Sequence, residues 1–227
     1  MTNNKIAIID YKMGNLGSVF NAFVKVGAKA ELVSDPDQLS QYGRVTLPGV
    51  GAFPDAMKSL KRSGMDQAIK EFAASGKPIM GTCLGMQLLF DSSEEFGEHE
   101  GLGLIPGKVV EFDKSKFDNP KLKVPHMGWN EMFTKGLTSN DLSQSDESFA
   151  GLTLKENSIF KGLPNEFYLY FVHSFHAVCD DEYAIGKTKY GYEFVSAVNK
   201  DNIYGFQPHP EKSHNVGLKI LENFVKL

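Results

Sequence analysis

One short segment limits the possible folds more than any other part of the chain. It reads PIMGTCLGMQLLF over residues 78–90, an apolar run followed by Gly81, Cys83, Gly85 and an amphipathic helical pattern. This order is typical of a nucleophile elbow, a sharp strand-to-helix turn that holds a reactive side chain away from the backbone. The two glycines leave room for the turn and for a substrate to approach. The helix N-terminus favours a thiolate at Cys83, whereas the alternative is a buried structural cysteine.

The composition predicts one globular domain with a substantial core. The chain has 227 residues, of which 41% are hydrophobic and 23% charged. Its net charge of −4 argues against nucleic acid or an anionic membrane surface as the main partner. Two cysteines are too few for a disulfide framework, and we expect neither a secretory signal nor a membrane-spanning segment. The expected location is therefore the cytoplasm.

The first half of the chain alternates between strand-like and helix-like patterns. Strands are expected at residues 5–10, 30–33, 44–47 and in the run into Gly81. Helices are expected at residues 14–26, 54–60, 65–74 and 84–91. Alternation of this kind predicts a parallel sheet with helices on both faces.

The second half contains short segments rich in aromatic and β-branched residues. Strands are expected at residues 107–112, 168–172, 175–178, 183–189, 194–198 and 203–207, and a helix at 213–227. The polar segment 134–162 is expected to be an exposed insertion rather than a linker. Residues 1–227 should thus form a single α/β domain, with a largely parallel central sheet, flanking helices and additional antiparallel strands in the second half.

A cysteine nucleophile needs a base, and the base needs a group that orients it. Among the six histidines, His209 lies in the run GFQPHPEKS, with a proline on either side and a carboxylate nearby. The prolines restrict the backbone, so the imidazole is presented in a fixed direction. Glu211 can accept a hydrogen bond from one ring nitrogen while the other faces Cys83. The alternative is a rigid surface turn with an incidental histidine.

The pattern Gly-x-Cys-x-Gly-x-Gln, followed much later by His-Pro-Glu, resembles the class I glutamine amidotransferases. Cys83, His209 and Glu211 match the catalytic triad of that family. Four further runs resemble one branch, the glutaminase subunits of imidazole glycerol phosphate synthase. They are DYKMGN (10–15), PGVGAF (48–53), PHMGWN (125–130) and YFVHSF (170–175). The resemblance covers nearly the whole chain and implies that it supplies ammonia for histidine biosynthesis.

The resemblance implies hydrolysis of L-glutamine by covalent catalysis, without a cofactor. Cys83 would attack the side-chain amide carbon, His209 would protonate the leaving ammonia, and water would hydrolyse the thioester. The amide of Leu84 is the expected first oxyanion donor, and the loop at Val50 or Gly51 is expected to supply the second. That loop would equally fit a plain strand-to-helix turn.

The resemblance assigns substrate contacts to Gln87 and to the run His173, Ser174 and Phe175. Gln87 lies four residues after Cys83, on the same helical face. The alternatives are a glutamine that satisfies a nearby backbone group and a structural histidine. The His-x-x-His spacing at positions 173 and 176 lacks further ligands, so no metal site is expected.

Ammonia released into water would be protonated, so glutaminases of this kind dock onto a synthase. The resemblance implies a heterodimer with a cyclase subunit of the β/α-barrel type. The residues that it assigns to the docking surface are Asn15, Met127, Trp129, Asn130 and Lys212. Trp129, the only tryptophan of the chain, would fit an interface anchor or the core.

Two features depart from the branch pattern. Lys12 stands where the branch usually has a glycine, and the insertion at 134–162 is longer than expected. They leave open a paralogous glutaminase that feeds ammonia to a cell-surface sugar amidation pathway. A catalytically inactive scaffold of the same fold is a further alternative, against which the intact triad argues. A cysteine peptidase fits the triad but not the motifs at Gln87 and Trp129.

Overall fold

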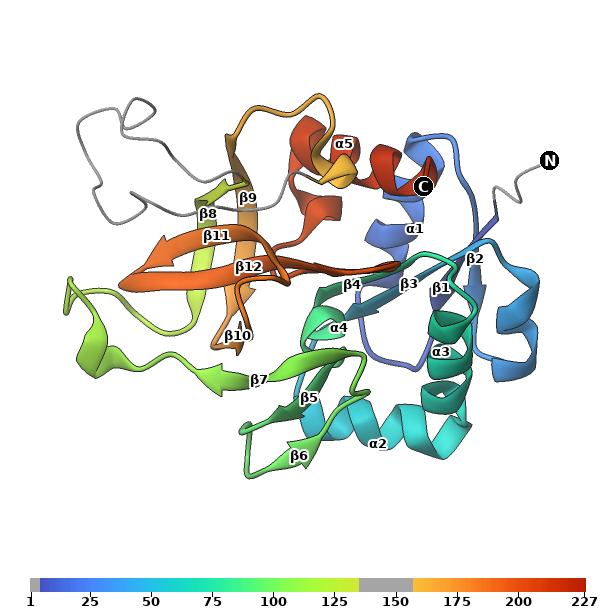
Figure 1. Cartoon of the computed structure of the whole chain (residues 1–227), viewed down its shortest axis with the longest axis horizontal. Coiled ribbons are helices and arrows are strands. Elements are labelled where there is room, and N and C mark those ends of the chain that lie inside the picture. Colours follow the sequence, from blue (N-terminus) through green and yellow to red (C-terminus); the bar gives the residue numbers. More distant parts are fainter. Residues whose placement is uncertain (1–4, 135–156) are drawn as a thin grey trace.

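One mixed sheet organises the molecule. The computed structural model describes residues 5–134 and 157–227, and within these ranges thirteen strands form the sheet (Figure 1). The strands are β1 (Lys5–Ile9), β2 (Lys29–Val33), β3 (Arg44–Gly49), β4 (Ile79–Cys83), β5 (Phe90–Ser93), β6 (His99–Glu100), β7 (Ile105–Glu111), β8 (His126–Phe133), β9 (Glu166–His173), β10 (Phe175–Val178), β11 (Ala184–Tyr190), β12 (Tyr192–Lys200) and β13 (Ile203–Phe206). The main path runs β2-β1-β3-β4-β13-β12-β10-β7-β5-β6, and β11, β8 and β9 extend from β12 as a side branch.

The sheet changes from parallel to antiparallel along its length. The pairs among β2, β1, β3, β4 and β13 are all parallel. From β13 onward, the pairs with β12, β10, β11, β8 and β9 are antiparallel, whereas β5 and β7 pair in parallel. The predicted fold class, a largely parallel centre with antiparallel strands in the second half, is therefore confirmed.

Helices cover both faces of the parallel part. They are α1 (Leu16–Lys25), α2 (Phe53–Ser63), α3 (Met65–Ala74), the short α4 (Leu84–Gln87) and α5 (His214–Val225). In the view of Figure 1, α1 and α5 lie above the sheet and α2 and α3 below it. Strand β1 serves both layers because its side chains alternate in direction. Ile6 and Ile8 pack in the core with α1 and α5, and Ala7 and Ile9 in the core with α2 and α3.

The helix predicted at 84–91 is wrong in its second half. Helix α4 ends at Gln87, and Phe90 already begins β5. Leu88, Leu89 and Phe90 are all fully buried, so this stretch has no polar face to present to solvent. The carbonyls of Leu88 and Leu89 instead accept hydrogen bonds from the backbone of the segment 102–105, which ends the helix.

None of the helices within the described ranges has the length and apolarity that crossing a membrane requires.

Strand β8 (His126–Phe133) was not predicted, although the motif PHMGWN was noted as a sequence run. Glycine and asparagine interrupt its apolar pattern, and it pairs with β9 over its whole length.

Most of the predicted insertion at 134–162, residues 135–156, lies outside the residues that the structure describes. Its last part is not an exposed loop: Ile159 and Phe160 are buried, and the Asn223 side chain of α5 donates to the Ile159 carbonyl at 2.9 Å.

The glycines beside Cys83 leave room for the tight turn, as expected, through close packing rather than through unusual backbone angles. Neither Gly81 nor Gly85 has a positive φ. A Cβ atom on Gly85 would overlap the carbonyl oxygen of Leu47 in β3, and one on Gly81 would lie 2.5 Å from the carbonyl oxygen of Gly85. The two glycines therefore allow helix α4 to pack directly against the strands below it.

We predict that Gly85→Ala destabilises the protein by at least about 2 kcal/mol, because the overlap is with backbone that cannot move independently. Gly17→Ala is the matched control: Gly17 is exposed in α1, and its added Cβ meets nothing within 4 Å. This control should leave stability unchanged or raise it slightly. Urea unfolding of both variants measures the difference, and equal stabilities would contradict the packing argument.

Candidate active site

Three neighbouring parallel strands end at the same edge of the sheet. The register sets Gly49 of β3 beside Cys83 of β4, and Thr82 of β4 beside Phe206 of β13. The carboxyl ends of parallel strands are where open α/β sheets place their ligand crevices. Residues near positions 50, 83 and 209 therefore meet although they lie far apart in the sequence.

Cys83 occupies the turn between β4 and α4 in a strained conformation. Its φ of 53° and ψ of −116° are rare for a residue with a side chain, and such strain is retained where the surrounding structure enforces it. The residue is 7% exposed. Its Sγ lies 3.8 Å from the carbonyl oxygen of Val172 and 3.9 Å from the side-chain nitrogen of Gln207. The predicted strand-to-turn-to-helix geometry around the cysteine is thus present.

His209 and Glu211 form a buried hydrogen-bonded pair. The Nδ1–H of His209 donates to Oε1 of Glu211 at 2.8 Å, and both side chains are less than 5% exposed. The backbone of His209 is held on both sides, since its N–H donates to Tyr170 and its carbonyl accepts from the Ser213 hydroxyl. The other ring nitrogen, Nε2, is buried without a hydrogen-bond partner in the described part of the chain. It is therefore available for a reacting group.

The environment of His209 favours the charged imidazolium. Burial on its own lowers the pKa of His209, but the sulfur of Cys83 and the carboxylate of Glu211 raise that pKa more strongly, to about 10. A charged His209 has a proton to give on Nε2 while Glu211 holds the proton on Nδ1. The pair is therefore arranged as a proton donor.

A cavity of about 240 Å³ unites the predicted site residues. It is lined by Val50, Gly51, Cys83, Leu84, Gln87, Glu95, Val172, His173, Ser174, Phe175 and His209. Every residue expected to act as nucleophile, acid–base group, oxyanion donor or substrate contact is among them. Glu211, bonded to His209, is not part of the lining.

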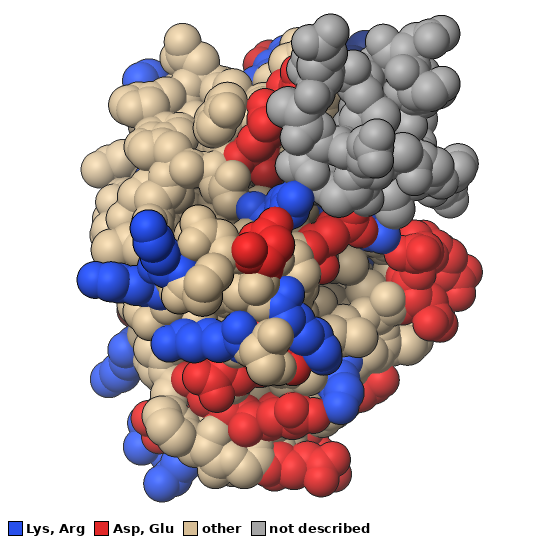
Figure 2. Space-filling view, turned by 90° about the vertical axis from the view of Figure 1, so that its left-hand side faces the viewer, with Lys and Arg blue, Asp and Glu red and all other residues tan. Residues whose placement is uncertain are grey.

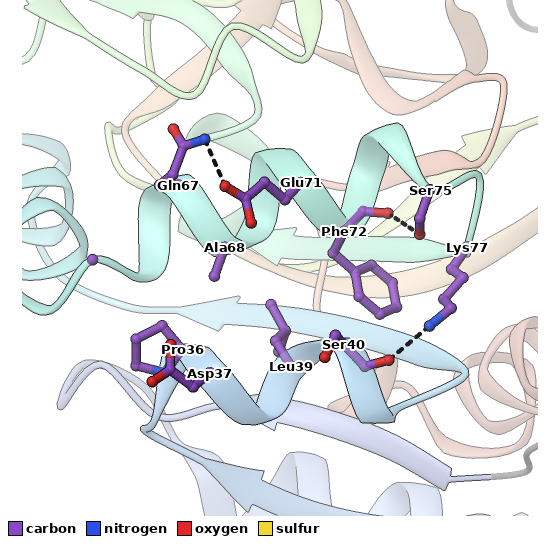
Figure 3. Close-up of a pocket in the computed structure, with 11 residues that line it drawn as sticks. Pro36, Asp37, Leu39, Ser40, Gln67, Ala68, Glu71, Phe72, Ser75 and Lys77 are labelled. Atoms are coloured by element: carbon purple, nitrogen blue, oxygen red, sulfur yellow. Dashed lines mark hydrogen bonds between the residues drawn. The ribbon is translucent and has the colours of Figure 1, made fainter.

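A second cavity, of about 490 Å³, shares no lining residue with the first. It lies between the 3-10 helix η1 (Pro36–Gln41) and α3 (Figure 3). Several of its polar side chains bond to neighbours within the protein: Gln67 donates to Glu71, and Lys77 donates to the Ser40 carbonyl (Figure 3). The strained nucleophile and the free imidazole nitrogen therefore assign the chemistry to the smaller cavity.

Backbone amides are available beside the nucleophile. Leu84 is the first residue of α4, and an amide in the first turn has no partner within its own helix. In the neighbouring loop, Gly51 has a φ of +107°, and a Cβ there would lie 2.8 Å from the Met13 side chain. The loop therefore needs glycine at position 51, and the backbone of Val50 and Gly51 can lie directly against the cavity.

The Gln87 side chain supports the site through other protein groups. Its amide nitrogen donates to the Phe175 carbonyl at 3.0 Å and to the side-chain oxygen of Gln207 at 3.1 Å. Sequence reasoning did not assign a role to Gln207, which is fully buried and lies two residues before His209. An amide side chain at the end of the apolar strand β13 was the signal that could have identified it.

Two further residues near the site were also not predicted. Tyr11, in the noted run DYKMGN, donates to the Pro48 carbonyl at 2.9 Å; burial raises its pKa far above the usual range, and Cys83 adds to this effect. Glu95 accepts from the Phe53 amide at 2.8 Å, and burial raises the pKa of its carboxyl. Glu95 lies outside the motifs noted in the sequence, and nothing within DYKMGN distinguishes Tyr11 from its neighbours.

The loop after β1 holds Lys12 in a backbone conformation that glycine favours. This lysine adopts a φ of +67°, the left-handed conformation that glycine takes easily, and its amide donates to the Asp10 side chain. Asn15, assigned to the docking surface, caps helix α1 by accepting from the Ser18 amide. The difference in sequence at position 12 is therefore accommodated by local strain.

An exposed aromatic surface lies on β8 and β9, close to the active site. Met127 is 63% exposed and Trp129 is 47% exposed, so Trp129 is not a core residue. The Trp129 ring stacks on His214 with a centroid distance of 5.1 Å. Lys212 Nζ lies 5.8 Å from the centre of the Tyr170 ring. Asn130 differs from these, because its side chain donates to His126 and to the Lys189 carbonyl.

Charges of both signs are mixed on the outer surface. Figure 2 shows acidic and basic side chains interspersed on one face of the molecule, and pairs such as Lys108–Glu94 and Lys189–Asp118 bring them together. A mixed surface of this kind creates little long-range attraction for a polyanion. Within the described residues, no group of three or more His, Cys, Asp or Glu side chains is placed to hold a metal ion.

Comparison with known proteins decides the family. The model of the family "Glutamine amidotransferase class-I" matches residues 7–227. The chain belongs to this family. It is 62% identical to the imidazole glycerol phosphate synthase subunit HisH of Sulfurimonas denitrificans, over 97% of each chain. It is 52% identical to the subunit of that name from Wolinella succinogenes, over 98% of this chain and 99% of the relative. The resemblance seen in the motifs, to class I amidotransferases and to the HisH branch, is confirmed.

Solved structures of other proteins share the fold. A putative GMP synthase protein from Thermoplasma acidophilum aligns with a TM-score of 0.66 at 19% identity, covering 98% of this chain and 92% of the other. PurLQS from Thermotoga maritima aligns with a TM-score of 0.69 at 18% identity, covering 98% and 97%. At these identities the likeness concerns the fold alone.

We predict that His209 of this class I amidotransferase stays protonated well above the ordinary histidine pKa of 6.5. Because the folded-state pKa is raised, its stabilising contribution is complete below pH 6.5 and is lost as the pH rises through about 10. Glu211→Gln should lower the pKa of His209 by about one to three units. NMR titration of the imidazole measures both effects.

Glu95→Gln is the matched control, because Glu95 lines the same cavity without contributing to the pKa of His209. It should leave the titration of His209 unchanged. A wild-type pKa near 6.5 would show that the buried pair does not hold the proton as described.

Proposed function

We propose that the chain hydrolyses L-glutamine to glutamate and ammonia, with Cys83 as nucleophile, His209 as acid–base group and Glu211 as its orienting carboxylate. The observation that carries this proposal is the free Nε2 of a buried, carboxylate-bound His209 in the same cavity as the strained Cys83. The membership of the class I amidotransferase family agrees with this chemistry.

The reaction would proceed in two halves. The Cys83 thiolate attacks the side-chain amide carbon of glutamine, and the carbonyl oxygen becomes an oxyanion facing the Leu84 amide and the Val50–Gly51 loop. Nε2 of His209 gives its proton to the amide nitrogen, so ammonia leaves and a thioester remains. Water then attacks the thioester while the neutral His209 takes up its proton. Glutamate leaves, and the thiolate and imidazolium are restored.

The substrate's amino and carboxylate groups would be held by Ser174, Phe175 and Gln87, which line the same cavity as Cys83. Since the nitrogen of the Gln87 amide is used within the protein, its oxygen is the atom left to accept from the substrate ammonium. His173 uses both ring nitrogens in contacts with His126 and Phe175, so we assign it to holding the segment rather than to direct recognition.

We further propose that the ammonia passes directly to a cyclase subunit of the β/α-barrel type in a heterodimer that makes imidazole glycerol phosphate. Relatives at 62% and 52% identity are named as subunits of that synthase, which supports a partner subunit for this chain. The exposed Met127 and Trp129, near His209 through Tyr170, offer an apolar docking surface. The proposed location is the cytoplasm, where the unpaired Cys83 and Cys179 would remain reduced.

The names of the relatives favour histidine biosynthesis over a sugar amidation pathway. The inactive scaffold is disfavoured by the assembled cavity, and a peptidase would need a long open cleft instead of a cavity of about 240 Å³.

We predict that Cys83→Ala lowers glutamate release from glutamine by at least about 1,000-fold, since loss of a covalent nucleophile disables the whole triad. Cys179→Ala is the control, because this second cysteine lies outside the cavity. Enzymatic assay of glutamate measures both variants. Turnover that survives in Cys83→Ala would refute the nucleophile.

The inactive Cys83→Ala variant should still capture its partner from the source cell, because Cys83 is only 7% exposed and its truncation removes nothing from the exposed side chains of Met127 and Trp129. Mass spectrometry of the captured protein identifies it. A β/α-barrel cyclase supports the proposed partner, whereas a sugar-modifying synthase overturns it.

A further inference from the structure

A chain of polar side chains leads from β8 to the wall of the active-site cavity. Nδ2 of Asn130 lies 3.2 Å from Nε2 of His126, and Nδ1 of His126 lies 2.9 Å from Nε2 of His173. Nδ1 of His173 in turn lies 2.8 Å from the carbonyl oxygen of Phe175. His126 and His173 are 2% and 6% exposed, so these contacts are shielded from water.

The contacts fix the direction of every hydrogen bond in this chain. A carbonyl oxygen can only accept, so Nδ1 of His173 carries the hydrogen and, in the neutral ring, Nε2 must accept. His126 therefore donates from Nδ1, and its own Nε2 accepts from Asn130. Burial keeps both rings neutral: it lowers the pKa of His126 to about 4 and that of His173 well below the usual range. Each histidine is thus held in one tautomer.

The chain ends on an atom that the catalytic side of the cavity also uses. The Phe175 carbonyl accepts from Nε2 of Gln87 at 3.0 Å as well as from His173. Gln87 also donates to Gln207, whose side-chain nitrogen lies 3.9 Å from Sγ of Cys83. The position of this carbonyl is therefore set jointly by the two histidines and by the nucleophile's own neighbours.

We propose that His126, which does not line the cavity, is a positioning residue for glutamine binding: by holding His173 in one tautomer and one orientation, it fixes the segment 173–175 that forms the cavity wall. This inference rests on the proposed glutaminase function. The Asn130-to-Phe175 chain would be a preorganising device, so that the segment need not be ordered when glutamine binds.

The competing role for His126 is packing alone. Its ring stacks on Phe171 and Tyr190, with centroid distances of 4.8 and 4.0 Å. His126→Phe preserves this stacking but cannot donate to His173. His126→Asn loses the stacking but keeps a donor, because the asparagine Nδ2 branches from Cγ as the histidine Nδ1 does. The two roles therefore predict opposite orders for the two variants.

Glutamine protection of Cys83 against iodoacetamide tests the proposal by a readout other than glutamate release. The full-length chain is titrated with glutamine, and alkylation of the peptide that contains Cys83 is followed by mass spectrometry. Alkylation of Cys179 in the same samples reports on general opening of the fold. His176→Phe is the matched control, because His176 is a buried histidine packed on Phe112 but outside the polar chain.

In His126→Phe we expect the half-protecting glutamine concentration to rise about tenfold, which corresponds to about 1.4 kcal/mol. His126→Asn and His176→Phe should stay within about threefold of wild type. Should His126→Phe fail to fold, His126→Gln replaces it, because its amide lies at the Nε position and is too far from His173. Either of these two variants is expected to show the tenfold loss.

Three outcomes would overturn the proposal: wild-type protection in His126→Phe, equal losses in His126→Asn and His126→Phe, or an equal loss in His176→Phe. Failure of the proposed function looks different. In that case glutamine would not protect Cys83 in the wild-type protein at any concentration.

Discussion

The close packing of helix α4 against strand β3 is the constraint on which the active site depends. Gly85 lies so near the Leu47 carbonyl that no side chain fits between them. This approach forces Cys83 into its strained turn and sets the first amides of α4 at the sheet edge. The parallel register then places Gly49 beside Cys83 and Phe206 beside Thr82. The loop after β3 and the segment with His209 after β13 therefore begin at the same edge of the sheet as Cys83.

Burial gives the assembled groups their chemical properties. A histidine and a glutamate that are each less than 5% exposed would be costly if unpaired, yet their mutual hydrogen bond satisfies one side of the imidazole. The remaining nitrogen stays unsatisfied within the described residues, which is the energetic cost of keeping a proton donor ready for a substrate. Gln87, which also lines the cavity, is held by neutral hydrogen bonds to the Phe175 carbonyl and to the buried Gln207, so the cavity combines charged groups with a polar lining.

Sequence patterns predicted those features that depend on local order. The elbow at 81–85 and the His-Pro-Glu run carry their chemistry in adjacent residues, and the alternation of strands and helices determined the parallel core. Features that depend on tertiary contacts were missed. Helix α4 stops at Gln87 because the backbone of segment 102–105 donates to the carbonyls of Leu88 and Leu89, and no pattern within 84–91 reveals this.

The same limit applies to individual residues. The partner of His173 proved to be His126, 47 positions away, through the pairing of β8 with β9. Gln207 reaches Cys83 only because β13 lies beside β4. Trp129 could have been core or surface from its sequence alone, and the pairing of β8 with β9 places it on the exposed face next to Tyr170. Long-range register, rather than composition, decided each of these cases.

Acid quenching of the protein during turnover is the sharpest test of Cys83 as the nucleophile, because it looks for the covalent intermediate itself. The protein is mixed with L-glutamine, quenched with acid within the first turnovers and digested. The masses of the peptides that contain Cys83 and Cys179 are then measured by mass spectrometry. We expect a γ-glutamyl thioester on the Cys83 peptide and none on the Cys179 peptide. Glutamate release without any such adduct on Cys83, at quench times that span the first turnover, would contradict covalent catalysis by this residue.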